Sequence, residues 1–78
     1  MPSKSRPRLN SVNYRDVVKA FEKCGFKVVR QVGSHITMRK PGHVLILTVP
    51  AHKPVASGTL KALIRNAGIT PEQFAEYL

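Results

Sequence analysis

Gly33-Ser34 interrupts a stretch of β-forming residues, and this break constrains the fold more than any other feature of the sequence. Residues 26–32 before it are rich in β-branched and aromatic side chains, which favour strands. Residues 35–39 after it alternate between polar and apolar side chains, so Ile36 and Met38 are expected to point into a core. The opposite face of this second strand then carries His35, Thr37 and Arg39.

A helix before this hairpin and two elements after it are also predicted. Asn13 has the side chain of a helix N-cap, and apolar residues then recur at helical spacing until Gly25. The run 44–49 is almost wholly apolar and short, which suits a central strand better than a helix. A further helix is expected to begin near Ser57, with its apolar stripe at Leu60, Leu63, Ile64 and Ala67.

The last nine residues predict a short final helix. Thr70 and Gln73 have the spacing of a capping box, and Pro71 occupies the first helical position. The predicted order is therefore α-β-β-β-α followed by a short C-terminal helix. This is an α+β fold, in which helices cover one face of a three-stranded antiparallel sheet and leave the other face open.

Length and composition exclude several classes of protein. We expect one small domain over residues 10–78, after a basic flexible arm over residues 1–9. The single Cys24 forms no intramolecular disulfide and no Cys/His cluster has zinc-ligand spacing, so no metal or other cofactor is expected. No apolar run approaches the roughly 18 residues of a membrane helix, and the basic start lacks a signal-peptide core. We therefore expect a cytoplasmic protein that does not enter the membrane.

The strong positive charge points to an anionic partner. Thirteen Lys and Arg residues against four Asp and Glu residues give a formal net charge of +9. Such an excess attracts polyanions, so nucleic acid or an acidic protein is the expected partner, although charge alone also keeps a small domain soluble. The candidate phosphate-binding residues are Ser34, Thr37, Arg39, Lys40, Lys53, Lys61 and Arg65.

His35 is the candidate catalytic residue, because an imidazole can move a proton at neutral pH. RNA carries a 2′-hydroxyl beside each phosphate, and a general base that removes its proton lets the oxygen attack phosphorus without a metal ion. The four acidic residues lie on predicted helices, and none is close in sequence to His35, which argues against a two-metal nuclease. The alternative is a strand histidine with a structural role.

Several short blocks resemble the HicA-type toxins, also called YcfA-like, of bacterial toxin–antitoxin systems. In order along the chain they are Lys23-Cys24-Gly25-Phe26, Arg30-Gln31-Val32-Gly33-Ser34-His35, Thr48-Val49-Pro50 with His52, Gly58-Thr59-Leu60 and Ala67-Gly68-Ile69-Thr70. The resemblance spans nearly the whole chain after the arm.

The resemblance implies a double-stranded-RNA-binding-domain-like fold and a metal-independent ribonuclease that binds and cleaves single-stranded messenger RNA. It also implies growth arrest and inhibition by a HicB-type antitoxin, and it gives no reason to expect DNA binding. The catalytic histidine of these toxins corresponds to His35. Many members carry a second histidine directly after it, where this chain has Ile36, and a core-facing position should tolerate the change.

The neighbours of His35 have weaker assignments. Gly33 is expected to support the turn by permitting a positive φ. His52 can assist as an acid or a phosphate contact, although its place between two prolines fits a loop-orienting role equally well. His43 follows a Pro-Gly pair and is expected to be a solvated turn residue.

Two other functions fit the sequence. The first is a non-catalytic RNA-binding module of the same fold, but such modules use a dense lysine cluster where this chain has only Lys53 and Lys61. The second is a domain that binds only an acidic protein, and it predicts no affinity for RNA at moderate salt.

Overall fold

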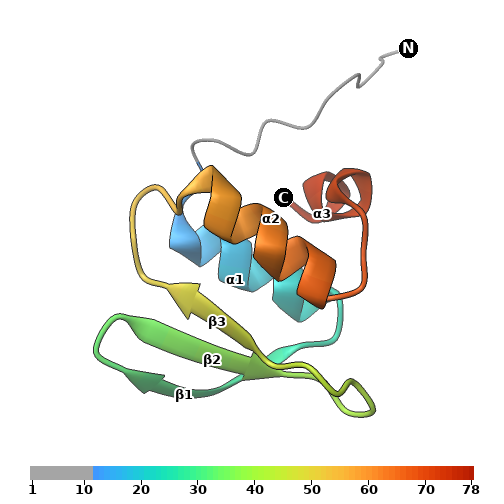
Figure 1. Ribbon diagram of the computed structural model, residues 1–78, viewed down its shortest axis with the longest axis horizontal. Helices are drawn as coiled ribbons and strands as arrows, with labels where there is room; N and C mark the ends of the chain where they lie inside the picture. Colours follow the sequence, from blue (N-terminus) through green and yellow to red (C-terminus); the bar gives the residue numbers. More distant parts are fainter. Residues whose placement is uncertain (1–11) are drawn as a thin grey trace.

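The structure is a computed structural model that describes residues 12–78, and it has the predicted α+β architecture. The arm predicted over residues 1–9 lies outside the described residues. Figure 1 shows a layer of helices above one face of a small sheet. In chain order, the elements are α1 (Tyr14–Lys23), β1 (Lys27–Val32), β2 (His35–Arg39), β3 (Leu47–Pro50), α2 (Ser57–Asn66) and α3 (Pro71–Tyr77).

The helices begin and end at the residues that the sequence predicts. The Asn13 side chain accepts a hydrogen bond from the Arg15 backbone N–H at 3.0 Å, which caps α1. Thr70 and Gln73 form both hydrogen bonds of the capping box that starts α3. Gly25 follows α1 with a φ of 104°. This positive φ is unfavourable for residues that have a side chain, and glycine adopts it readily.

The sheet is an antiparallel meander in the order β1-β2-β3, so β2 is its central strand. Val32 pairs with His35 across the two-residue turn Gly33-Ser34. Gly33 has a φ of 59° and Ser34 has a negative φ, the combination of a type II′ turn. Within β2, Ile36 and Met38 are buried as predicted.

The prediction of a central strand over residues 44–49 is wrong in both extent and position. β3 comprises only Leu47–Pro50 and lies at an edge of the sheet, and Val44 is 91% exposed. The pairing with β2 ends at Leu47 opposite Met38. Beyond that pair, the Lys40 carbonyl accepts the His43 N–H at 3.0 Å in a turn, so residues 44–46 have no strand to pair with.

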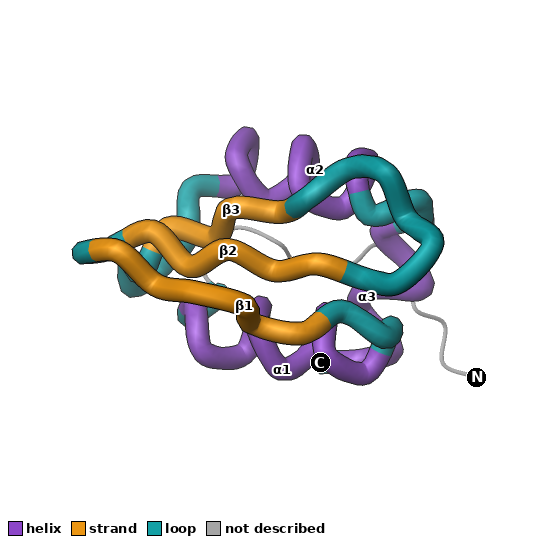
Figure 2. Tube along the Cα trace, turned by 90° about the horizontal axis from the view of Figure 1, so that it is seen from below, coloured by secondary structure: helices purple, strands orange, loops and turns teal. Residues whose placement is uncertain are grey.

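The core lies between the sheet and the helices. Figures 1 and 2 place α1 and α2 on the same face of the sheet, with α1 toward β1 and α2 toward β3. Phe21 of α1 is completely buried, and its ring centroid lies 6.0 Å from that of Phe26 and 5.1 Å from that of Phe74. The apolar stripe predicted for α2 is buried in full: Leu60, Leu63, Ile64 and Ala67.

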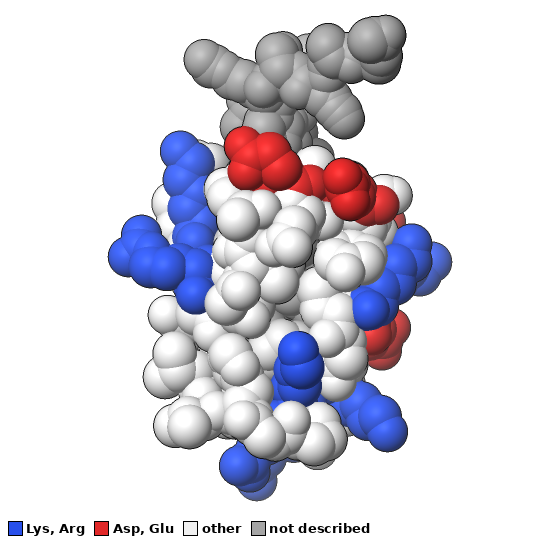
Figure 3. All heavy atoms as spheres, turned by 90° about the vertical axis from the view of Figure 1, so that its right-hand side faces the viewer, with Lys and Arg blue, Asp and Glu red and all other residues white. Residues whose placement is uncertain are grey.

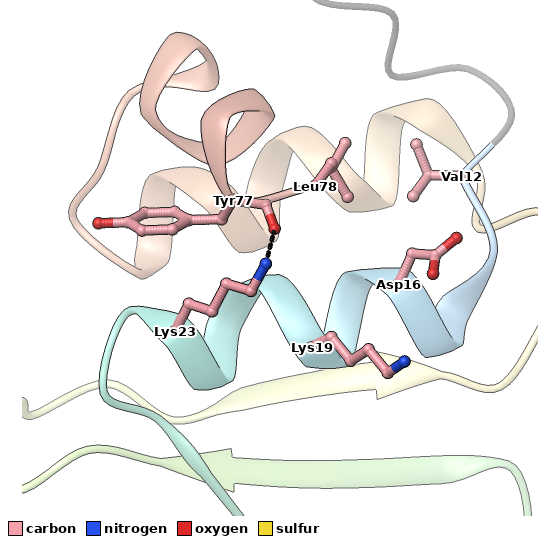
Figure 4. A pocket seen from close by; sticks show the side chains of 6 residues that line it. All are labelled: Val12, Asp16, Lys19, Lys23, Tyr77 and Leu78. Carbon is pink, nitrogen blue, oxygen red and sulfur yellow. Dashed lines mark hydrogen bonds between the residues drawn. The ribbon is translucent and has the colours of Figure 1, made fainter.

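Hydrogen bonds between residues far apart in the sequence connect each end of α1 to another part of the fold. In Figure 4, the Lys23 ammonium of α1 donates a hydrogen bond of 3.0 Å to the Tyr77 carbonyl of α3, beside a hollow of about 320 Å³. At the other end of α1, the Tyr14 N–H donates to the His52 carbonyl at 3.3 Å. Among residues 12–78, no helix has the length and apolar character needed to cross a membrane.

Candidate functional site: the open face of the sheet

His35 lies at the start of β2, on the face of the sheet that no helix covers. Its strand neighbours are Val32 on β1 and Pro50 on β3, and its side chain is exposed. Within residues 12–78, no hydrogen bond ties its ring to another residue. The ring is therefore open to contact by a bound molecule.

The turn before His35 is held by hydrogen bonds from both neighbouring strands. The Gln31 side-chain amide donates to the Gly33 carbonyl at 3.1 Å. The Ala51 N–H donates to the Ser34 carbonyl at 2.7 Å, which continues the β2–β3 pairing beyond β3. The positive φ of Gly33 agrees with the expectation for this residue, and the turn fixes the point at which β2 begins.

The strand alternation brings three predicted site residues to one face. Thr37 and Arg39 follow His35 at intervals of two residues along β2, so all three side chains project from the open face. Arg39 is exposed and Thr37 is half-buried. The sequence-based grouping of these residues is therefore reproduced by the geometry.

Two cations that sequence analysis did not select also lie on this face. Lys27 pairs with Arg39, and Arg30 pairs with Thr37, so each shares the face of its partner. An irregularity between Val28 and Arg30 makes this possible, because one additional residue shifts the alternation of β1. A regular strand would put Lys27 and Arg30 on opposite faces, and the sequence carries no clear signal of the shift.

The other cations predicted to contact phosphate do not lie on the open face. They are found in the loop after β3, on α2 and beside Phe26. Lys53 is exposed in the loop that follows β3, at the end where the Ser34 carbonyl meets Ala51, and His52 is exposed beside it. Lys61 and Arg65 are exposed on α2, in the helical layer. The half-buried Lys40 extends over Phe26, with its ammonium 5.7 Å from the ring centroid.

His43 has a structural role, which corrects the expectation of a solvated turn residue. Its Nε2 lies 2.7 Å from the Asn66 carbonyl at the end of α2, and the ring is half-buried. Because a carbonyl oxygen only accepts, Nε2 carries the proton and donates. The ring also packs edge-on against Phe26, with 5.3 Å between centroids. His43 therefore joins the loop after β2 to α2.

Cys24 is not placed to act as a nucleophile. It is half-buried at the end of α1 and packs against the core. Burial raises the pKa of its thiol above the ordinary value, and the charge of Lys40 lowers it by a smaller amount. The protonated thiol is therefore favoured at neutral pH, and a thiol is a poor nucleophile.

The acidic and basic residues are distributed unevenly over the fold. The four acidic residues lie on α1 and α3: Asp16, Glu22, Glu72 and Glu76. In Figure 3, no acidic side chain appears at the lower end of the view, where the sheet lies, whereas Lys or Arg side chains do. In the described part of the chain, no three His, Cys, Asp or Glu side chains are grouped closely enough to hold a metal ion.

The chain matches the model of a known protein family. The model of the family described as the HicA toxin of bacterial toxin–antitoxin systems matches residues 14–69, from the start of α1 to just beyond α2. The chain belongs to the HicA toxin family. It is therefore a toxin of a toxin–antitoxin system, and membership implies an antitoxin partner. No match was found among individually curated proteins.

Proposed function

We propose that this HicA-family toxin is a metal-independent endoribonuclease that cleaves single-stranded messenger RNA in the cytoplasm, with His35 as its general base. The observation that carries the proposal is the exposed His35 ring, which has no hydrogen bond to any other residue within 12–78 and lies on a face with Thr37 and Arg39. Membership of the toxin family supports the same conclusion. A substrate whose nucleophile is its own 2′-hydroxyl needs a base and a cationic surface, and both are on this face.

The proposed step removes a proton from one oxygen, gives a proton to another and exchanges one bond at phosphorus. A ring nitrogen of His35 takes the proton of a 2′-hydroxyl, and the freed oxygen bonds to the adjacent phosphorus. The bond between phosphorus and the 5′-oxygen breaks, and that oxygen takes a proton from water. The hydroxide that remains takes the proton held by His35, which restores the base. His52, two residues beyond the strand partner of His35, is a second candidate donor of the proton that the 5′-oxygen takes. The products end in a 2′,3′-cyclic phosphate and a 5′-hydroxyl.

Cationic side chains would stabilise the transition state by offsetting charge on the phosphoryl oxygens. Lys53 is proposed to do so from the loop that adjoins the His35 end of the sheet, whereas Arg39, four residues along β2 from His35, is proposed to position the RNA by binding a neighbouring phosphate. The Ser34 hydroxyl, next to the catalytic residue in the turn, is a candidate donor to the same phosphate. Three other cations lie outside this face: Lys61 and Arg65 on α2, and Lys40 over Phe26. They are proposed to contact the more distant parts of a longer RNA.

Inhibition by a HicB-type antitoxin is proposed to occur by occlusion of this face. A partner with acidic groups opposite the sheet would associate quickly, in a salt-sensitive way, with a toxin of net charge +9. Such a partner would bury His35 without unfolding the toxin.

We expect the purified toxin to cleave a mixed-sequence RNA in excess chelator and to leave the all-2′-deoxy strand of the same sequence intact. The deoxy strand has the same phosphates but lacks the attacking oxygen. The measurement is gel analysis of both strands, with the cognate antitoxin added in a parallel reaction that should show no cleavage. Cutting of the deoxy strand, or RNA cleavage that requires a divalent cation, would refute the proposed chemistry.

A further inference from the structure

The shift in β1 changes which residues face the same side as His35. Lys27 pairs with Arg39 and Val28 pairs with Met38, but the next pair joins Arg30 to Thr37, so Val29 is the additional residue. A bulge of this kind redirects the side chains that follow it and occurs often beside functional sites. Here it brings Arg30 to the open face, where the Arg30 side chain is exposed.

The paired residues form three parallel rows across the open face. The first row contains Val32, His35 and Pro50, the second contains Arg30, Thr37 and Thr48, and the third contains Lys27 and Arg39. Successive rows lie about 7 Å apart, which is two residues along a strand. This spacing is similar to the separation of successive phosphates in an extended nucleic acid strand.

The charge of the rows favours a polyanion on this face. Lys27, Arg30 and Arg39 lie in the two rows beyond His35, and each of them is exposed. The acidic residues lie on α1 and α3, which belong to the other layer. A bound polyanion would therefore meet the attractive charges of β1 and β2 and no acidic side chain of the sheet strands.

The same face lacks the groups that read bases. Phe21, Phe26 and Phe74 are buried in the core, and Tyr14 and Tyr77 belong to helices. No aromatic ring of the described sheet therefore offers a stacking platform, and contacts to sugar and phosphate remain.

We propose that Lys27, Arg30 and Arg39 form a track that binds the unpaired RNA backbone next to the phosphate at His35. This proposal adds an RNA-binding site to the proposed ribonuclease function and rests on that function. An unpaired strand fits because attack at phosphorus needs the 2′-oxygen in line with the departing 5′-oxygen, a geometry that A-form pairing hinders. The three cations are positioning residues. They hold successive phosphates in the second and third rows, and this fixes which phosphate lies at His35.

The track is tested by the salt dependence of binding to a six-nucleotide 2′-O-methyl RNA, which cannot be cleaved because its 2′-oxygens are blocked. Arg30→Gln and Arg39→Gln are compared with Lys19→Gln, an exposed cation on α1 that loses the same charge. Fluorescence anisotropy gives the slope of log binding constant against log salt. Each lost phosphate contact should make this slope shallower by about 0.7 in the arginine variants, and Lys19→Gln should keep the wild-type slope.

Two outcomes would overturn the track: slopes of the arginine variants equal to that of Lys19→Gln, or tighter binding of the duplex form of the same oligonucleotide. Thermal melting of each variant shows whether the fold is kept. The blocked oligonucleotide also separates the two proposals. Shallower slopes with no cleavage of ordinary RNA would keep the track and reject the nuclease. Cleavage of ordinary RNA with unchanged slopes would reject the track and keep the nuclease.

Discussion

His35→Ala is expected to lower the rate of RNA cleavage at least about 100-fold, the lower end of the range for loss of a general base. The loss should appear at saturating RNA, because the imidazole acts in the chemical step and the phosphate contacts of Arg39 remain. Stability should change by less than about 0.5 kcal/mol, since the ring is exposed and has no hydrogen bond within the described residues. Single-turnover cleavage in excess chelator measures the effect.

His43→Ala is the matched control for this experiment. It also removes an imidazole, but one that donates to the Asn66 carbonyl and packs on Phe26. We expect it to lower the melting temperature and, at a temperature where it remains folded, to cleave RNA at close to the wild-type rate. Equal cleavage by His35→Ala and the wild type would show that the assignment of the base is wrong, or that a contaminant cuts the RNA.

Phe21→Ala is expected to lower the free energy of unfolding by about 3–5 kcal/mol, the usual cost of deleting a buried aromatic ring. The ring is fully buried and joins three elements, because it contacts Phe26 before β1 and Phe74 of α3. A domain of this size has a stability of roughly 4–12 kcal/mol, so the variant should be largely unfolded at elevated temperature. Urea unfolding followed by circular dichroism measures the change.

Val44→Ala provides the contrast. Val44 is apolar but 91% exposed, so its truncation should change the free energy of unfolding by less than about 0.5 kcal/mol. A cost for Phe21→Ala no greater than that of Val44→Ala would mean that the core does not depend on this aromatic cluster.

The parts of the fold that depend on local chemistry could be predicted from the sequence. The Asn13 cap, the capping box of Thr70 and the glycine turn before His35 each involve residues within a few positions of one another. The alternation of β2 was sufficient to place Ile36 in the core and Arg39 on the open face.

The parts that depend on distant pairing could not be predicted. An apolar run such as 44–46 has the composition of a strand whether or not it has a partner, and the turn at Lys40 removes its partner. The ring of His43 is held by Asn66, 23 positions away. Arg30 reached the open face through a bulge whose position is defined only by the pairing with β2.

The chemical nature of the RNA ends tests the central claim most directly. After cleavage by the wild-type toxin in excess chelator, mass spectrometry of the fragments distinguishes attack by the 2′-oxygen from attack by water. Our account predicts fragments that end in a 2′,3′-cyclic phosphate and fragments that begin with a 5′-hydroxyl. Fragments with a 3′-hydroxyl and a 5′-phosphate would contradict it, because water and not the RNA itself would then have been the nucleophile.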